Sequence, residues 1–269
     1  MPNYICRTCG VQHAATDQPP GRCAICEDER QYIGWSGQQW TTLEALRADH
    51  RNTLKREGPG IISIGTEPSF AIGQRALLVQ ARGGNVLWDC ISLIDDATIA
   101  AVRELGGISA IAISHPHYYA SMVEWSRALG NAPIYLHAAD RQWVMRPDPA
   151  IVFWEGETHS LGKGLTLIRC GGHFEGATVL HWEAGENGRG ALLTGDVIKV
   201  SSDRRYVSFM YSYPNWIPLG TSAIDRIVKA VQPFEYERIY GAWWDHIVFQ
   251  DAKTAVARSA KRYLEAIRQ

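Results

Sequence analysis

The sequence has little that would attach the protein to a membrane or to a polyanion. No window approaches the roughly 20 apolar residues of a membrane-spanning helix, and the first residues lack an apolar stretch of signal-peptide length. The 27 Lys and Arg residues balance 28 Asp and Glu residues, which gives a net charge of -1, and the basic residues form no cluster. We therefore expect a cytoplasmic globular protein without a membrane or nucleic-acid partner. The sequence leaves its oligomeric state open.

Four of the six cysteines form a pattern that is typical of a metal-binding module. Their spacing is C-x2-C-x13-C-x2-C, and they are Cys6, Cys9, Cys23 and Cys26. Two residues between cysteines allow a tight turn that directs both thiolates at one ion, and a second such turn completes a tetrahedral site. A segment as short as residues 1–35 cannot bury a sufficient core. Metal binding, on the order of 10 kcal/mol, would therefore stabilise it as a structural module.

Zinc is the expected ion of this module, and iron is the alternative, because four thiolates suit both metals. The segment resembles zinc ribbons and also rubredoxin, since Cys9-Gly10 matches a rubredoxin knuckle. Glu27 stands where the second rubredoxin knuckle would have glycine, which favours zinc. Two disulfides or four idle thiols are the remaining interpretations, and the lack of a secretory segment argues against both.

After this module the sequence predicts a connector and a larger domain. Residues 36–60 contain a capping-box pattern, Thr41 with Glu44, and we interpret the segment as a helical connector. Residues 61–269 begin with short apolar runs and continue with strand patterns that alternate with helical ones. This order predicts an α/β (α+β) domain in which helices cover mixed sheets.

Metal-binding side chains follow three of the predicted strands. His115 and His117 come directly after an apolar run. His173 comes after a strand that ends at Cys170 and is followed by two glycines, and Asp196 comes after the strand at 191–194. Two histidines at i and i+2 of an extended segment point the same way, so that both can reach one ion. Sites are often built where strand ends meet at one edge of a sheet. The sequence therefore predicts a metal site at this edge.

The order of these motifs resembles the metallo-β-lactamase superfamily over residues 61–269. His115-Pro116-His117 matches the first half of the family's H-x-H-x-D-H motif, and Gly172-His173 matches its third motif. Leu193-Thr194-Gly195-Asp196 matches the strand that ends in the bridging aspartate, and Asp89 matches the first acidic position. The resemblance implies an αββα sandwich in which the three histidines and Asp196 bind metal, with Asp89 near the pocket.

Three residues depart from the family's pattern, and all three stand where it has ligands of a second metal. Tyr119 and Ala120 replace the D-H of the first motif, and Ala242 replaces the last ligand histidine. His246 follows four residues later, and the pattern does not place it, so we regard it as a further pocket residue. The main domain is therefore expected to hold one ion, zinc or iron. Tyr119 is expected either to orient substrate or stabilise an oxyanion, or to fill the vacant second site.

The resemblance implies a metal-dependent hydrolase in which the ion lowers the pKa of a bound water to about 7. Asp196 would bind the ion or hold the water. The sequence leaves the substrate unknown, and an ester-, thioester- or lactone-like molecule is the class that we expect. The aromatic segment at residues 207–216 is expected to roof the pocket or to be a buried strand. One alternative is a mononuclear iron oxidoreductase similar to the persulfide dioxygenases, with His115, His173 and Asp196 as ligands. Another alternative is a binding protein that has lost catalysis.

Overall fold

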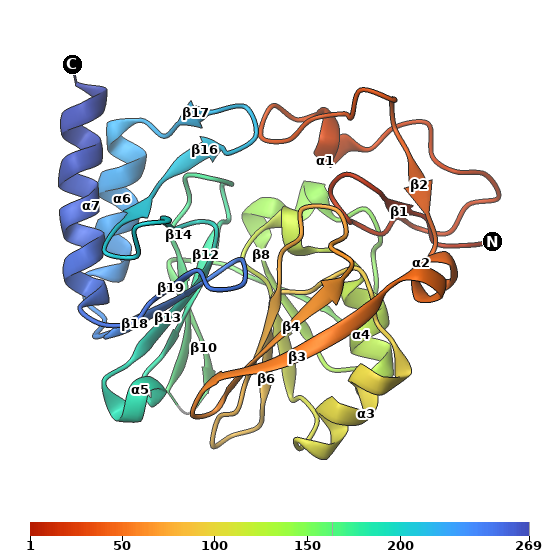
Figure 1. The fold of residues 1–269 in the computed structure, drawn as a ribbon, viewed down its shortest axis with the longest axis horizontal. Coiled ribbons are helices and arrows are strands. Elements are labelled where there is room, and N and C mark those ends of the chain that lie inside the picture. The colour runs from red at the N-terminus through yellow and green to blue at the C-terminus, as the bar shows by residue number, and fades with distance from the viewer. Residues whose placement is uncertain (163, 269) are drawn as a thin grey trace.

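Two β-sheets are stacked face to face, with helices on both outer sides (Figure 1). The computed structural model describes residues 1–162 and 164–268, so that Lys163 and Gln269 of the predicted main domain lie outside the described residues. Helices α3 and α4 lie beside the first sheet, and α6 and α7 lie beside the second (Figure 1). The αββα sandwich that the resemblance implied is confirmed.

The described strands and helices have the following bounds. The first sheet runs in the order β3 (Arg51–Gly58), β4 (Ile61–Glu67), β5 (Ala76–Val79), β6 (Val86–Trp88), β7 (Ala110–Ala112), β8 (Ile134–His137) and β9 (Ile151–Trp154). The second runs in the order β10 (Thr158–Gly162), β11 (Leu165–Arg169), β12 (Thr178–Trp182), β13 (Ala191–Gly195), β18 (Arg238–Gly241) and β19 (Ile247–Val248). Three small ribbons pair β1 (Ile5–Cys6) with β2 (Trp40–Thr41), β14 (Lys199–Val200) with β15 (Val207–Ser208), and β16 (Met210–Ser212) with β17 (Ile217–Pro218). The helices are α1 (Ala24–Glu27), α2 (Leu43–Asp49), α3 (Asp96–Glu104), α4 (Met122–Ala128), α5 (Gly185–Gly188), α6 (Thr221–Val231) and α7 (Ala252–Ile267), with 3-10 turns η1 (Pro116–Tyr118) and η2 (Ala138–Trp143).

Alternation along the strands divides the apolar side chains into three layers. In β5, Leu77 belongs to the cluster between the two sheets, whereas Leu78 belongs to the outer cluster that includes α4. In β13, Leu193 belongs to the cluster between the sheets, whereas Leu192 packs in the cluster that includes α6 and α7. Successive side chains of a strand point to opposite faces, so each sheet buries apolar residues on both of its faces. The rigid strand ends that result can position a site at the sandwich edge.

The prediction of a helical connector at residues 36–60 is wrong for its second half. Helix α2 is present, and Thr42 caps it by accepting a hydrogen bond from Ala45 N at 3.2 Å. The residues that follow form β3, which pairs antiparallel with β4 at the edge of the first sheet. This strand has mostly polar side chains, as suits an edge strand that is partly open to solvent, and so it lacks an apolar signal. The second half of the connector therefore belongs to the sandwich.

The N-terminal segment lies at one end of the sandwich, close to the ribbon of β16 and β17 (Figure 1). The Asn215 side chain of that ribbon donates to the carbonyl oxygens of Glu29 and Gln31, at 2.8 and 2.9 Å. Residues 1–35 are therefore packed against the main domain. Within the described chain, the helices are all too short or too polar to cross a bilayer.

Candidate metal centre

Four metal-binding side chains come from the ends of three strands. They are His115 and His117 after β7, His173 after β11, and Asp196 after β13. Gly171 and Gly172 have φ angles of 69° and 81°, which glycine adopts easily, and they turn the chain just before His173. A Cβ atom at Gly195 would lie 2.8 Å from Ser114 Oγ. Glycine at that position therefore lets the ends of β7 and β13 approach each other.

The structure brings these four side chains to one point. Their ligand atoms all lie within 4.8 Å of one another, and all four residues are buried. His115 Nε2 is 3.1 Å from Asp196 Oδ1, and His117 Nδ1 is 3.3 Å from His173 Nε2. Three imidazoles and one carboxylate whose ligand atoms lie this close together have the dimensions of a single coordination shell.

Three polar atoms of these side chains are buried without a hydrogen-bond partner among the described residues. They are His115 Nε2, His117 Nε2 and Asp196 Oδ1. Two hydrogen bonds fix the orientation of the His173 ring, because its Nδ1 donates to the carbonyl oxygens of Met210 and Tyr211, at 3.2 and 2.9 Å. Its Nε2 therefore carries the lone pair. Unpaired buried polar atoms are unfavourable, and a divalent ion bound by this set would satisfy them, zinc and iron both being compatible.

Burial favours the neutral form of two of the imidazoles. It lowers the pKa of His173 to about 4 and the pKa of His117 well below its usual value. Burial alone would raise the pKa of Asp196, but His115 beside it holds that pKa well below its usual range. At neutral pH His117 and His173 therefore offer nitrogen lone pairs and Asp196 offers an ionised carboxylate, which are the states that metal binding requires.

Asp89 lies behind His115 and supports it from outside the four-residue cluster. Asp89 Oδ1 accepts a hydrogen bond from Ser114 N at 2.7 Å. Ser114 Oγ in turn lies 2.9 Å from His115 Nδ1. Burial raises the pKa of Asp89 to about 7, against the opposing effect of the bond from Ser114. This chain of groups directs His115 Nε2 toward the cluster.

The tyrosine whose ring packs on a ligand histidine is Tyr118, whereas the sequence pattern indicated Tyr119. The Tyr118 ring lies 5.5 Å from that of His115, and its hydroxyl donates to the Ala242 carbonyl oxygen at 3.4 Å. The expected extended segment is instead the 3-10 turn η1, whose three residues per turn place His115 and Tyr118 on the same side. Tyr119 is buried in the outer cluster with α4. Burial raises the pKa of both phenols well above the usual value, so that both are neutral.

No second set of ligands adjoins this cluster in the described part of the chain. The side chains of Ala120 and Ala242 carry no donor atom. His246 Nδ1 donates to the Trp244 carbonyl oxygen at 3.0 Å, and its ring lies 5.7 Å from that of Trp243. His246 is therefore outside the four-residue cluster, and it contributes to the wall of a neighbouring pocket.

This neighbouring pocket has a volume of about 330 Å³, and the segment at residues 207–216 contributes much of its wall. Tyr213 lines the pocket and donates from its hydroxyl to the Asp196 carbonyl oxygen at 2.9 Å. Met210 also lines it, and its carbonyl oxygen accepts from His173. The pocket therefore adjoins the metal-binding cluster through two of its wall residues.

Lys199 is the charged residue of this pocket, and the sequence analysis missed it. Its ammonium group lies 4.3 Å from the ring centroid of Tyr213 and 4.5 Å from that of Trp243. Burial lowers its pKa, while the carboxylate of Asp196 opposes that shift. The available signal was the position of Lys199 three residues after Asp196, which itself follows the end of β13.

The four cysteines of the N-terminal motif face one another as free, buried thiols. The sulfur atoms of Cys6 and Cys26 are 3.5 Å apart, and those of Cys9 and Cys23 are 3.7 Å apart. Sulfurs bound at about 2.3 Å to a tetrahedral ion lie about 3.8 Å from one another, whereas a disulfide would need about 2.05 Å. Gln38 Nε2 donates to Cys6 Sγ at 3.1 Å, as a group supporting a thiolate would. The arrangement suits one ion held by four thiolates.

Comparisons with known proteins agree with this fold. The chain is 55% identical to the Bacillus subtilis (strain 168) protein YmaE over 269 residues, which cover 99% of this chain and 97% of that protein. No protein-family model matches the chain. Among solved structures, TMB-1 aligns with a TM-score of 0.61 at 13% identity, covering 81% of this chain and 99% of that one. The mono-zinc form of the metallo-β-lactamase FIM-1 from Pseudomonas aeruginosa aligns with a TM-score of 0.57 at 18% identity, covering 78% and 95%.

Proposed function

Because the chain belongs to the same family as YmaE and has the metallo-β-lactamase fold, we propose that it is a hydrolase with one catalytic metal ion. The substrates would be small esters, thioesters or lactones. The observation that carries the proposal is the buried cluster of three imidazoles and one carboxylate, in which donor atoms without hydrogen-bond partners face one point. The four-Cys site would hold a second, structural zinc.

Each residue of the cluster has a role that follows from its contacts. A divalent ion bound there would supply Lewis acidity and lower the pKa of a bound water to about 7. His115, His117 and His173 would hold the ion, and Asp196 would complete the set as its anionic member. Asp89 acts through Ser114 to fix the His115 ring, and the Met210 and Tyr211 carbonyl oxygens fix the ring of His173. The protein thus orients the ligands before the ion arrives.

The adjoining pocket is the proposed place for the substrate. Its volume of about 330 Å³ suits a small molecule, and its walls combine the apolar surface of Met210 and Trp216 with one cation. Lys199 would pair with an anionic group of the substrate, since its ammonium group faces two aromatic rings, and no carboxylate of the described residues lies at salt-bridge distance from it. The substrate would therefore combine a hydrolysable acyl group with a nearby negative charge.

The test is a screen of the zinc-loaded protein against ester, thioester and lactone substrates, each with and without a carboxylate. We expect hydrolysis that a chelator abolishes and that added zinc restores. His173→Ala should lose at least a hundredfold in kcat/KM, because removal of a ligand removes the metal. His159→Ala is the matched control, since His159 stacks on Tyr135 and Trp154 away from the cluster, and it should retain activity.

Other outcomes of the same experiment would point to the alternatives. Iron in the main site of protein purified without added metal, with no hydrolysis, would support the oxidoreductase. A main site that holds a metal but hydrolyses no substrate in the panel, with or without zinc, would support a binding protein. Equal activity of His173→Ala and His159→Ala would contradict the assignment of the cluster as the active centre.

A further inference from the structure

The four-Cys module contacts the chain segments that carry the main-domain ligands. Ser92 Oγ donates to the Gly10 carbonyl oxygen at 2.7 Å, and Ser92 follows Asp89 by three residues. Gln12 N donates to the Ala120 carbonyl oxygen at 3.0 Å, and Ala120 follows His117 by three residues. Gly10 and Gln12 themselves follow Cys9 by one and three residues. One cysteine knuckle is therefore bonded to two of the loops that surround the cluster.

The second knuckle reaches the cluster through Arg30. This residue follows Cys26 by four positions, and its Nη1 donates to the His173 carbonyl oxygen at 3.3 Å. The guanidinium lies 4.0 Å from the centroid of the Phe174 ring. Asp28 fixes it in place through two bonds, from Nε at 2.6 Å and from Nη2 at 2.8 Å. Arg30 is thus fixed by a residue of the four-Cys module and contacts residues of the main-domain site.

Phe174 connects Arg30 to every imidazole of the cluster. Its ring centroid lies 5.6 Å from that of His115, 5.0 Å from that of His117 and 5.2 Å from that of His173. The guanidinium packs on this ring with 13% of the Arg30 side chain exposed, so little water separates the two groups. A shift of Arg30 would free the ring against which three ligands pack.

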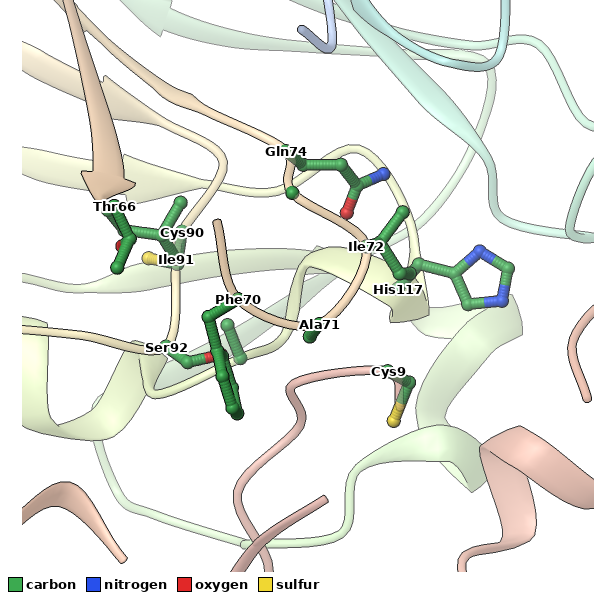
Figure 2. A pocket seen from close by; sticks show the side chains of 12 residues that line it. Cys9, Thr66, Phe70, Ala71, Ile72, Gln74, Cys90, Ile91, Ser92 and His117 are labelled. Atoms are coloured by element: carbon green, nitrogen blue, oxygen red, sulfur yellow. The ribbon is translucent and has the colours of Figure 1, made fainter. Parts of the chain in front are cut away.

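The two metal sites are also close to each other. Cys9 and His117 both line one small pocket of about 30 Å³, together with residues of the loop between β4 and β5 (Figure 2). The Asn215 bonds to Glu29 and Gln31 add a further link, because the same ribbon contains the carbonyl oxygens that hold His173. The module therefore touches the cluster from several sides.

We propose that the four-Cys module is a clamp for the main-domain metal centre, and that Arg30 is its principal positioning residue. Metal binding by the four cysteines fixes the two knuckles, and the knuckles hold the loops that carry His117 and His173. Loss of the ion from the four thiolates would then weaken metal binding at the cluster. The proposal rests on the metal centre of the proposed function, and it is independent of the identity of the substrate.

The physical basis is a coupling free energy between two sites. Such couplings change affinities by about 5- to 150-fold, and they act equally in both directions. A module of this size cannot keep its fold by apolar burial alone, so the position of Arg30 depends on the ion held by the cysteines. The contacts of Gly10, Gln12 and Arg30 then transmit that dependence to the ligands.

The experiment measures metal affinity at the cluster in the full-length protein. Cobalt(II) bound by nitrogen and oxygen ligands absorbs differently from cobalt(II) bound by four thiolates, so that a competing chelator can be titrated against each site separately. Arg30→Ala should lower the affinity of the cluster tenfold or more while the four-Cys site remains filled. Arg30→Lys should restore only part of it, because a single ammonium cannot make the paired bonds of the guanidinium.

Arg22→Ala is the matched control. Arg22 belongs to the same module and pairs with a module acid, Glu27, but its side chain is 80% exposed. It should leave the affinity of the cluster unchanged. Cys9→Ser provides an independent arm, since it removes a thiolate ligand and should weaken metal binding at the cluster as Arg30→Ala does. Cys170→Ser, at a buried thiol outside the four-Cys group, should have no such effect.

Equal cluster affinities in Arg30→Ala, Arg22→Ala and the unaltered protein would overturn the role of Arg30. An unchanged affinity in Cys9→Ser after loss of its ion would overturn the clamp. These failures differ from a failure of the proposed function, in which the affinities would be coupled as described but no substrate of the panel would be hydrolysed. A cluster of the unaltered protein that binds no cobalt would contradict both.

Discussion

Two adjacent tyrosines show how a single turn decides the surroundings of a residue. Tyr118 and Tyr119 follow the same histidine pair, and both are buried. Both belong to the outer apolar cluster with α4, and the 3-10 turn η1 in addition brings Tyr118 against His115 and close to Ala242. Matching of sequence positions pointed to Tyr119, because such matching compares places along the chain and not directions of side chains.

We predict that removal of the two hydroxyls has unequal effects on activity. Tyr118→Phe frees the Ala242 carbonyl oxygen beside the cluster and should lower kcat about three- to tenfold, on the scale of one lost hydrogen bond. Tyr119→Phe should leave kcat within about twofold, since Tyr119 is buried in the outer cluster with α4. Neither change should alter metal content, because no phenol belongs to the ligand set. A larger loss of kcat in Tyr119→Phe would restore the orienting role that the sequence pattern indicated.

Asp140 is a second residue with an unusual environment, and it lies on η2 outside the ligand cluster. It is 1% exposed, and its Oδ1 accepts a hydrogen bond from Gly176 N at 2.8 Å. Burial raises its pKa to about 6, above the usual 3.8. The folded state therefore holds this proton more tightly than the unfolded chain does, and ionisation opposes folding.

The sign of this shift gives a prediction for stability against pH. Below about pH 4 the carboxyl is protonated in both states and there is no penalty. Between about pH 4 and pH 6 the unfolded chain ionises first, so stability is lost as pH rises, and above about pH 6 the loss is constant. Asp140→Asn keeps the acceptor for Gly176 and does not ionise. It should therefore gain stability over the unaltered protein across this window, by on the order of 2–3 kcal/mol.

Urea unfolding at pH 4.5 and pH 7.5 measures this difference. Metal loss at low pH affects both proteins alike, so it cancels when the variant is compared with the unaltered chain. Asp225→Asn, at an exposed position of α6, is the control and should follow the unaltered protein at both values. A stability difference for Asp140→Asn that is the same at both pH values would show that this carboxyl does not titrate in the window.

At the scale of elements, the strand ends were predictable and the contacts between elements were not. The apolar run before Ser114 and the glycines before His173 and Asp196 indicate where a buried strand ends and a turn begins. Each of these signals depends only on residues that are neighbours in the sequence. Distant strand ends could be grouped because the resemblance to a known fold supplied their arrangement. The polar edge strand β3 was missed, since an exposed strand carries no apolar alternation.

The contacts of the four-Cys module were missed for a different reason. The main-domain partners of Gln12 and Arg30 include the backbone carbonyl oxygens of Ala120 and His173, and a carbonyl oxygen is the same in every residue type. Such contacts leave no mark in the sequence. The pocket around Lys199 was missed similarly, because its walls come from segments on both sides of the β14–β15 ribbon. Only the folded chain shows that these segments meet.

At the scale of the whole molecule, the chain joins two metal sites of opposite character. The four-thiolate site has no open position, so that it suits a structural ion, whereas the cluster in the sandwich adjoins a pocket. The packed layers of the sandwich fix the strand ends. The four-Cys module contacts the loops that follow these strand ends (Figure 1). The two sites are therefore parts of one assembly.

This arrangement predicts that the chain binds two zinc ions tightly and no third. Two cations about 3.5–4 Å apart repel each other unless a full ligand set compensates. Here Ala120 and Ala242 provide no donor, and the Lys199 ammonium adds positive charge beside Asp196. Most ligands of a second ion at the cluster would be water molecules, so a weak chelator would remove that ion.

Native mass spectrometry with zinc titration measures the count directly. We expect two zinc ions per chain to survive exposure to a weak chelator, and one, held less tightly, to survive in either Cys9→Ser or His173→Ala. The double variant should retain none, because it lacks a ligand at each site. Three retained zinc ions in the unaltered protein would contradict the mononuclear centre. They would mean that His246, now bonded to the Trp244 carbonyl oxygen, turns toward the cluster when a second ion is present.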